Sequence, residues 1–501
     1  MIRKLGIAIV VVVAATILSC RYLLPERFAV NAPIGQMLFG WAGETPAPDQ
    51  IQERMRVPAG FSIGVYADGI QPTARFLRFA SGGHLLVSTP RSGGVVLLEP
   101  DSDSDGRSDG MRVLLSDLNR PHGVELRDGF LYVGETDAIA RVPFDETTGQ
   151  VTGAVERIVT GLPGGGNHWT KTIRFGPDGW LYMHVGSTCN VCIEADERRS
   201  TIMRFRADGS DGHIYATGLR NSVGFDWQPG TGDLYATDNG RDLLGDDFPP
   251  CELNRIVEGG FYGWPIANGD RVPDPDFGAG QEERIAASIP PAHPFRAHNA
   301  PLGITFVRGE RVPLEYRHAA LVALHGSWNR STKDGYKVVS LHWEPDGSIR
   351  EKDFATGFEL DEDVIGRPVD VIEGPDGAFY VSDDYAGAIW RIAYGEPATT
   401  AGGFPGEVLS EDPLAGLDAG ARVVLASEGE MLYEQFACAT CHEPERAPPG
   451  TAVKRLEKLD RRYTIETLTL LLQTPPNPMP TYPLSAGQMR ALSVYLLESY
   501  R

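Results

Sequence analysis

The segment GPDGAFYVSDDYAGAIWRIAY, from Gly374 to Tyr394, contains two short strands and the turns that bound them. A Pro-Asp-Gly turn opens it, and the residues that follow alternate between apolar and polar side chains, as a half-buried strand requires. The second strand, AIWRI, begins after the turn DDYAG. Asp-Gly and Gly-rich turns beside such alternation indicate a β-hairpin.

The same arrangement recurs along the middle of the chain. Similar units begin at Ser81, Arg127, Gly176, Gln228 and Tyr316, which makes six with the segment at Gly374. Repeats of this kind predict the blades of a β-propeller, an architecture that leaves only short strand edges exposed. We therefore expect an all-β six-bladed propeller over residues 46–394. The inserts between units would form loops on one face, where function usually resides.

Composition describes a folded, acidic chain. The 501 residues are 42% apolar and 23% charged, and the formal net charge is −21. This charge argues against nucleic acid and against anionic lipid as partners. Residues 421–501 contain nine Lys or Arg and nine Asp or Glu, so the negative charge lies in the preceding part of the chain.

A different kind of sequence follows the repeats. Residues 395–420 are rich in Gly, Pro and Thr and predict a linker. After it, FACATCHEPE contains Cys438, Cys441 and His442 in the C-x-x-C-H spacing of covalent c-type haem attachment. The two cysteines would form thioethers with the porphyrin, and His442 would ligate the iron.

A sixth iron ligand is expected from the Pro-rich segment NPMPTYPLS, which contains Met479. A thioether ligand raises the reduction potential and suits an electron carrier. The alternative is Met489, but its place in a helical pattern predicts a core position. Residues 421–501 are therefore expected to form a small all-α cytochrome c domain with one haem c.

The N-terminus predicts export. Arg3 and Lys4 precede an apolar run from Leu5 to Leu18, which is short for a membrane span and typical of a signal peptide. The sequence ILSC, ending at Cys20, resembles a bacterial lipoprotein box. Residues 1–20 are thus an acylated lipoprotein signal, an uncleaved anchor or a cleaved signal. Each alternative places the body of the chain in the periplasm, with membrane contact only through the N-terminus, and covalent haem attachment agrees.

Three further cysteines lie in the repeat region. In an oxidising compartment we expect a disulfide between Cys189 and Cys192. Cys251 would then be free, or would compete for one of these partners. The same three cysteines are also compatible with zinc.

Seven motifs follow one another through the middle of the chain. They are GNHWTKTIRFGPDGWLY, GLRNSVGFDW, TDNGRDLLGDDFPPCELN, GGFYGWP, APLGITF, LHGSWNR and GRPVDVIEGPDG. In this order, over most of residues 55–394, they resemble the glucose/sorbosone (pyranose) dehydrogenases that use pyrroloquinoline quinone (PQQ). The chain is closer to the sorbosone and pyranose branch than to the soluble glucose oxidisers. A C-terminal cytochrome is a variation among such relatives.

The resemblance implies a base and a set of cofactor contacts. His168, in GNHWTK, matches the family's base, and histidine titrates in the range that proton abstraction needs. PQQ carries three carboxylates, so cationic and fork-shaped donors suit it. The matching or nearby positions are Arg220, which is also a candidate catalytic residue, and Asn221, Arg367, Lys171, Asn239 and Arg330.

Two calcium sites are expected. The resemblance implies that a calcium ion beside the quinone is bound largely by backbone carbonyls in DNGR, at Gly240 and Arg241. Independently, DSDSDGRSDG has the D-x-D-x-D-G spacing of a calcium loop, with Asp101, Asp103 and Asp105 as ligands. Its far-end acid is not obvious; Asp109 is a candidate. The alternative is an acidic turn without a metal.

These features predict a periplasmic quinohaemoprotein. A sugar, or a related polyol or aldehyde, would be oxidised by hydride transfer to PQQ and calcium in the propeller. The haem would then pass the electrons singly to a soluble cytochrome or to the respiratory chain. The alternatives are a metal-dependent, lactonase-like propeller and a non-enzymatic docking propeller with a haem relay.

Overall fold

The computed structural model describes residues 29–31, 43–70, 73–395 and, beyond them, 402–403, 413–414, 417–448, 453–456, 459–461, 463, 465–473, 475 and 479–500. The chain divides into two compact units, Met1–Arg311 with His318–Gly402, and Val312–Arg317 with Gly403–Arg501. The expected signal at residues 1–20, including Cys20, and most of the linker at 395–420 lie outside the described residues. No helix in the described part is long and apolar enough to cross a membrane.

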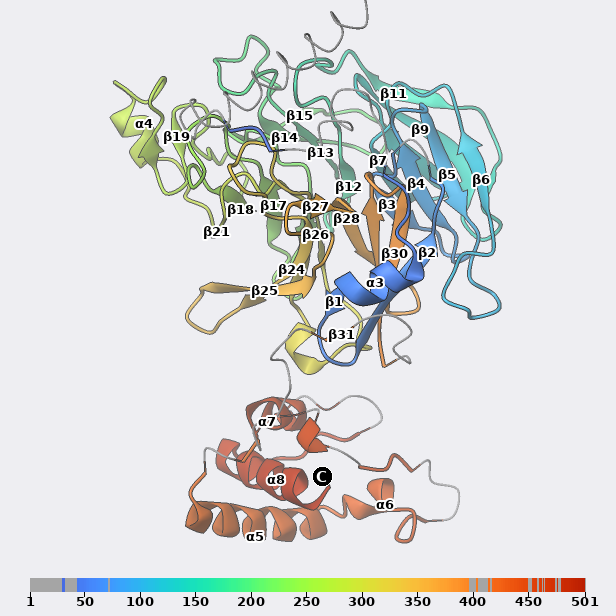
Figure 1. The fold of residues 1–501 in the computed structure, drawn as a ribbon, viewed down its shortest axis with the longest axis vertical. Helices are drawn as coiled ribbons and strands as arrows, with labels where there is room; N and C mark the ends of the chain where they lie inside the picture. The colour runs from blue at the N-terminus through green and yellow to red at the C-terminus, as the bar shows by residue number, and fades with distance from the viewer. Residues whose placement is uncertain are drawn as a thin grey trace, which may run out of the picture. The chain divides into compact units, whose positions relative to one another are not determined.

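The first unit is a six-bladed β-propeller, as the repeats predict (Figure 1). Each blade is an antiparallel sheet of four main strands, and the inner strands of most neighbouring blades contact one another. From the inner to the outer edge, the first blade contains β3 (Leu77–Phe79), β4 (Leu85–Thr89), β5 (Gly94–Leu98) and β6 (Met111–Leu115), and the second contains β7 (Gly123–Arg127), β8 (Phe130–Gly134), β9 (Ala138–Asp145) and β10 (Gln150–Val151). The third contains β12 (Ile173–Phe175), β13 (Leu181–Val185), β14 (Thr201–Phe205) and β15 (His213–Thr217), and the fourth contains β16 (Phe225–Trp227), β17 (Leu234–Asp238), β18 (Cys251–Ile256) and β21 (His293–Phe295). The fifth contains β22 (Pro301–Phe306), β23 (Ala320–Leu324), β24 (Lys337–Trp343) and β25 (Ile349–Ala355), and the sixth contains β28 (Pro368–Glu373), β29 (Phe379–Asp383), β30 (Ala388–Tyr394) and β2 (Phe61–Ala67).

Shorter elements lie between and around these strands. They are α3 (Pro48–Arg54), β1 (Arg56–Val57), β11 (Glu156–Thr160), which pairs with β9, β19 (Ala267–Asn268), β20 (Val272–Pro273), α4 (Glu282–Ala286), η2 (Leu314–Tyr316), β26 (Glu359–Leu360), β27 (Asp363–Val364) and β31 (Gly402–Gly403).

The ring is closed by its first long strand. β2 pairs antiparallel with β30, so the sixth blade takes its outer strand from the N-terminal side of the propeller. In this pairing Ile63, which is 1% exposed, lies opposite Ile392. A circular sheet arrangement closed in this way has only short, protected edges.

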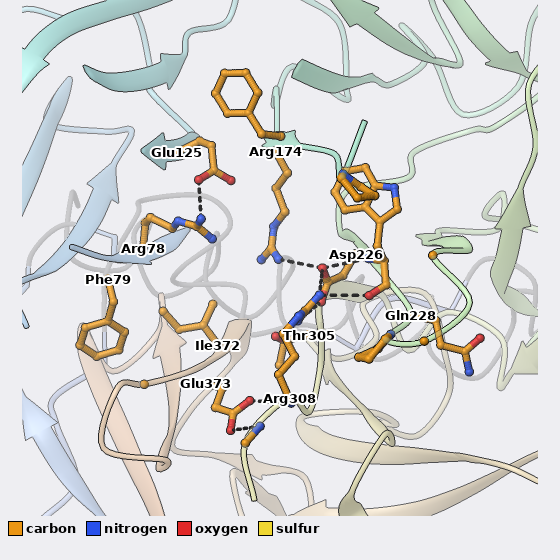
Figure 2. A pocket seen from close by; sticks show the side chains of 18 of the residues that line it. Arg78, Phe79, Glu125, Arg174, Asp226, Gln228, Thr305, Arg308, Ile372 and Glu373 are labelled. Atoms are coloured by element: carbon orange, nitrogen blue, oxygen red, sulfur yellow. Dashed lines mark hydrogen bonds and ion pairs between the residues drawn. The ribbon is translucent and has the colours of Figure 1, made fainter. Parts of the chain in front are cut away.

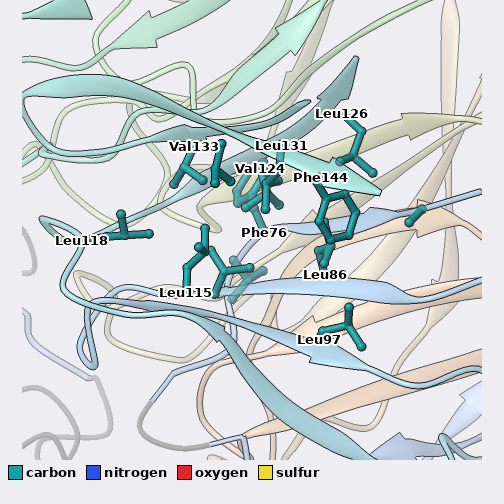
Figure 3. Packing of buried hydrophobic residues seen from close by; sticks show 14 of the residues in the cluster. Phe76, Leu86, Leu97, Leu115, Leu118, Val124, Leu126, Leu131, Val133 and Phe144 are labelled. Atoms are coloured by element: carbon teal, nitrogen blue, oxygen red, sulfur yellow. The ribbon is translucent and has the colours of Figure 1, made fainter. Parts of the chain in front are cut away.

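The core consists of apolar layers between consecutive blades. Leu86 and Leu97 of the first blade pack with Val124, Leu131 and Phe144 of the second (Figure 3). Equivalent clusters join the later blades and the sixth blade to the first. Each fully buried leucine contributes about 1.5–3 kcal/mol through removal of apolar surface from water.

The second unit is helical. Its elements are η2, α5 (Ala419–Gln435), α6 (Ala439–His442), η3 (Leu459–Arg461), α7 (Ile465–Gln473) and α8 (Ala486–Ser499). Asp418 caps α5, and α8 begins with the reciprocal Ser485–Gln488 capping box that its sequence indicates. Gly429 permits close packing of α5 on α8, because a Cβ atom there would collide with the Ala491 carbonyl.

Candidate functional site

A cavity of about 360 Å³ opens where the chain enters the inner strands. Its wall contains Thr73, Arg75, Pro90, Arg91, Arg120, Asn167, His168, Trp169, Thr170, Asn221, Val223, Leu302, Arg367 and Asp384. Most of these residues lie just before the first strand of a blade. Four arginines face a single carboxylate in this wall, although the whole chain carries a net charge of −21. The cavity is therefore a cationic site in an acidic protein.

His168 lies in this wall shortly before β12 and is half-buried. Its Nδ1 is 3.1 Å from the Ser187 carbonyl oxygen and 2.8 Å from the Ser187 hydroxyl. A carbonyl only accepts hydrogen bonds, so Nδ1 carries the proton and Nε2 keeps its lone pair. Burial and the neighbouring Arg220 lower the pKa of His168 to about 3. The His168 imidazole is therefore neutral at neutral pH.

Arg75, Asp384, His325 and Arg367 form one hydrogen-bonded row along the cavity. Arg75 pairs with Asp384 at 2.7 Å, and His325 Nε2 lies 2.9 Å from the same carboxylate. Arg367 donates to His325 Nδ1 at 3.0 Å. Burial alone would raise the pKa of Asp384, but His325 and the arginines hold it well below its usual value. The row holds both guanidinium groups at the wall.

Three buried polar atoms of the wall have no hydrogen-bond partner among the described residues. They are Thr73 Oγ1, Arg75 Nε and Asn221 Oδ1. Buried polar atoms are nearly always satisfied in native proteins, so this set fits a polar ligand in the cavity. Arg120 stacks over the Trp169 ring at 3.6 Å. Burial and the like charge of Arg91 lower the pKa of Arg120. Convergence of like charges favours an anionic ligand.

Asp238, at the end of β17, fixes the backbone beside the cavity. Its carboxylate accepts the N–H groups of Arg220 at 2.9 Å and Asn221 at 2.5 Å. Asp383, at the end of β29, accepts the N–H of Arg367 at 2.9 Å. Burial raises the pKa values of both acids to about 6. Thus the second strand of a blade anchors the loop that precedes its first strand.

The other expected cofactor contacts lie outside the described wall of this cavity. Arg220 donates to the Asn190 carbonyl at 2.8 Å and pairs with Asp242 at 3.0 Å. Lys171 donates to the Trp169 carbonyl at 3.2 Å, and burial lowers its pKa to about 7. Asn239 and Arg330 also contact neighbouring loops, through the carbonyls of Asn221, Pro301, Asp246 and Ala297.

The expected calcium carbonyls lie in the loop after β17. The Arg241 guanidinium is held by Asp274 at 2.6 Å and Asp276 at 2.9 Å, which leaves its carbonyl as the possible ligand. Neither that carbonyl nor the one of Gly240 accepts a hydrogen bond from the part of the chain that the structure describes. Oxygen ligands of this kind fit calcium.

The acidic segment DSDSDGRSDG gathers three carboxylates. Oxygens of Asp101, Asp103 and Asp109 lie within 4.8 Å of one another. Asp105 instead accepts the N–H of Arg107 at 2.8 Å, and its own N–H donates to Asp101 at 3.1 Å. The loop thus brings Asp109 into the position that the sequence leaves open, and Asp105 outside the group.

Cys189 and Cys192 form the expected disulfide, and Cys251 is a buried free thiol. Burial raises the pKa of Cys251 to about 11, so it stays protonated.

In the helical unit, the C-x-x-C-H motif forms α6. His442 Nδ1 lies 2.8 Å from the Lys454 carbonyl, and the Lys454 N–H donates to the Cys441 carbonyl at 2.9 Å. The carbonyl requires a proton on Nδ1, so Nε2 is free to ligate a metal. Met479 and Cys438 both pack against the apolar cluster of this unit, as does Met489 within α8. The motif is therefore presented in a form that suits an iron ligand.

A larger cavity, of about 1050 Å³, lies at the opposite ends of the inner strands (Figure 2). Arg78 pairs with Glu125 at 2.7 Å, and Asp226 receives Arg308 at 2.8 Å and Arg174 at 3.7 Å. These pairs balance one another, whereas the smaller cavity holds an excess of cations and unpaired polar atoms. The smaller cavity is the better candidate site.

Of the site residues expected from the sequence, His168, Asn221 and Arg367 lie in the cavity wall, whereas the sequence does not identify Arg75, Arg91, Arg120 or Asp384. The sequence does contain a pattern that indicates the segments in which some of these residues lie. Acids end or directly follow the second strands in YVGE, YATD and YVSD, and each accepts an N–H from the segment before its blade's first strand. Glu135 marks the segment next to Arg120 in this way.

The chain matches the TrAA12-like family model over residues 55–249 and 278–395, which is more than half of its length. It belongs to that family. It is 29% identical to an uncharacterized protein of Borreliella burgdorferi, over 70% of this chain and 93% of that one. It is 24% identical to the pyrroloquinoline quinone-dependent pyranose dehydrogenase of Coprinopsis cinerea, over 69% of this chain and 56% of the relative, about half of its length.

Solved structures support the fold. The holo form of the pyranose dehydrogenase PQQ domain from Coprinopsis cinerea aligns with a TM-score of 0.59 and 22% identity, over 68% of this chain and 97% of that one. The calcium structure of the Trichoderma reesei family AA12 protein aligns with a TM-score of 0.60 and 21% identity, with the same coverage.

Proposed function

We propose that this chain is a PQQ-dependent sugar dehydrogenase of the propeller type. The observation that carries the proposal is the cavity wall, in which four arginines and three unpaired buried polar atoms surround a single, already paired carboxylate. A tricarboxylate of the size of PQQ suits such a site. Arg75, Arg91, Arg120, Arg367 and Asn221 would hold the cofactor, with calcium at the carbonyls of Gly240 and Arg241.

PQQ, when bound with calcium, supplies a hydride acceptor for the carbon–hydrogen bond of the sugar. The chain itself supplies the base. His168 Nε2 takes the proton from the substrate hydroxyl, while Ser187 holds the ring through Nδ1. Burial, and secondarily the Arg220 guanidinium, lower the pKa of His168 and keep it neutral before the reaction. A lactonase-like metal site would need several carboxylates, which this wall lacks among the described residues.

The proposal extends to electron transfer. Cys438 and Cys441 would attach haem c covalently, with His442 and Met479 as its ligands, and this group supplies one-electron transfer. A soluble periplasmic cytochrome or the respiratory chain would be the final acceptor. The free Nε2 of His442 supports the assignment.

The test is anaerobic haem spectroscopy. The full chain is expressed with c-type maturation, loaded with PQQ and calcium, and mixed with aldoses, ketoses, sorbosone and polyols while the reduced haem α-band is followed. We expect reduction that requires PQQ and falls roughly 10²- to 10⁴-fold in His168→Ala, with PQQ binding kept. His318→Asn, at an exposed histidine, is the matched control. A haem that dithionite reduces but no sugar does, in a chain that binds no PQQ, would contradict the proposal.

The haem assignment has its own test. Haem should remain attached in a denaturing gel and be absent from Cys438→Ala/Cys441→Ala. Met479→Ala should remove the spectroscopic band of methionine ligation, while Met489→Leu should keep it. The opposite pattern would assign Met489 as the ligand.

A further inference from the structure

The loop from Ser187 to Cys192, here called the disulfide loop, contacts both His168 and Arg220. It follows β13 and is closed by the Cys189–Cys192 bond. We propose that the disulfide loop is a positioning element for the reaction, in which Ser187 orients the base and Asn190 orients Arg220. This inference rests on the proposed function, because that function assigns His168 and Arg220 to the chemistry.

The contact with His168 is directional. The Ser187 hydroxyl donates to the Cys189 carbonyl at 2.8 Å, so it accepts the Nδ1 proton of His168. The Cys189 carbonyl thus orients the Ser187 hydroxyl, which in turn orients the His168 imidazole. Blades two, four and six carry acids near this position, at Glu135, Asp238 and Asp383. A carboxylate would favour the charged imidazolium, whereas the serine orients the ring without adding charge.

The contact with Arg220 is double. Arg220 Nε donates to the Asn190 carbonyl at 2.8 Å, and Nη2 donates to Asn190 Oδ1 at 3.0 Å. The same Oδ1 accepts the Asp242 N–H at 2.8 Å, and Asn190 Nδ2 donates to the Asp242 carbonyl at 3.0 Å. Asn190 therefore holds Arg220 and the loop after β17 together.

The disulfide has a local role in this arrangement. It joins residues three apart in sequence, and so short a ring constrains the unfolded chain less than a long one. The disulfide instead fixes the backbone of Cys189 and Asn190. The Cys189 carbonyl accepts the Ser187 hydroxyl, and the Asn190 carbonyl accepts Arg220 Nε. Without it, the loop would have to keep both carbonyls in place by turn geometry alone.

The first experiment compares Asn190→Ala, Asn190→Asp and Thr188→Ala with the wild-type holoprotein. Loss of a hydrogen bond to a charged group should lower kcat roughly ten- to a hundredfold in Asn190→Ala, with the sugar KM nearly unchanged. The PQQ dissociation constant, from quenching of tryptophan fluorescence, should rise, because Asn190 also holds the loop after β17 that carries the proposed calcium carbonyls. Asn190→Asp keeps an acceptor and should recover most of kcat. Thr188→Ala removes hydroxyl contacts with Glu194 and the Cys192 sulfur but none with His168 or Arg220, so it should match the wild type.

The second experiment uses cofactor-free protein with ¹⁵N-labelled histidine. Wild-type His168 should show the Nδ1-protonated tautomer, and Cys189→Ser/Cys192→Ser should show a mixture. If that variant does not fold, the Asn190 pair still decides the matter. Unchanged kcat, PQQ binding and tautomer in the variants would overturn the inference. A wild type that binds no PQQ would overturn the proposed function instead, and the tautomer would still show whether the loop fixes His168.

Discussion

His168 is held neutral by burial and by the nearby Arg220 guanidinium, which lower its pKa to about 3. A base works only when unprotonated, and this group stays unprotonated until the pH approaches its folded pKa. We therefore expect that kcat/KM for the sugar does not fall as the pH is lowered from about 8 to 5. Steady-state rates with a fixed artificial acceptor would measure it. An acid limb near the ordinary histidine pKa would contradict the assignment.

Glu252 is also kept neutral in the folded protein, but by a raised pKa. Burial, and secondarily Asp238, raise its pKa to about 8. Between the usual glutamate pKa and that value, the folded protein keeps the proton and the unfolded chain releases it. Stability contributed by the protonated form is thus lost as the pH rises toward 8. Glu252→Gln should remove this dependence. Within that pH range, the difference in unfolding free energy between the Glu252→Gln variant and the wild type should change by about 1.4 kcal/mol per pH unit.

Urea unfolding of both proteins at several pH values, in a calcium chelator, would test this prediction. Equal slopes against pH would show that Glu252 is ionised in the folded state. Asp233→Asn, which alters a partly exposed acid paired with Arg255, is a suitable control for a simple change of charge.

At the scale of single residues, the sequence points to the proposed base, His168, but not to most of the cationic wall. His168 lies in a specific motif, so its place is predictable. Arg75 and Arg91 lie in loops of the first blade, Arg120 precedes the second blade and Arg367 the sixth, and only closure of the ring brings all four together. No local pattern records such a convergence. Orphaned atoms such as Asn221 Oδ1 likewise appear only after packing.

At the scale of elements, the six repeats are predicted correctly, but each repeat begins at the second strand of its blade. The units at Gly176, Gln228 and Gly374 open just before β13, β17 and β29. The inner strands are missed because several have only three residues, as β3, β12 and β16 do. Three residues are too few to show a period of two. Since the site precedes these inner strands, its residues look like connecting loops in the sequence.

Ring closure by β2 gives a prediction for that element. Ile63→Ala leaves a cavity at a fully buried position of β2 and should lower the unfolding free energy by about 2–5 kcal/mol. Val113→Ala on β6, where the side chain is 68% exposed, should change it by less than about 0.5 kcal/mol. Chemical denaturation of both variants would show the contrast. Equal effects would mean that β2 does not hold the ring closed.

At the scale of the whole molecule, we expect the net charge to govern electron transfer to the proposed acceptors. The net charge of −21 should attract cationic acceptors and repel ferricyanide. We expect the second-order rate with a basic cytochrome to fall as salt increases, and the rate with ferricyanide to rise, because added ions screen both interactions. Stopped-flow measurements over a range of ionic strength would show this. The same salt response for both acceptors would exclude control by the overall charge.

The pairing of β2 with β30 also determines how long β2 remains unpaired while the chain is being synthesised. The Ser62 hydroxyl donates to a carbonyl 331 residues further on, so among the described residues β2 has no strand partner until nearly the whole propeller has been made. At typical rates of synthesis this takes roughly 15 to 70 s. During that interval β2, whose side chains are almost all buried in the final fold, is an apolar strand with open edges. The youngest chain is therefore the most prone to aggregate, and a holdase that covers β2 would raise the yield more than faster folding of any single blade.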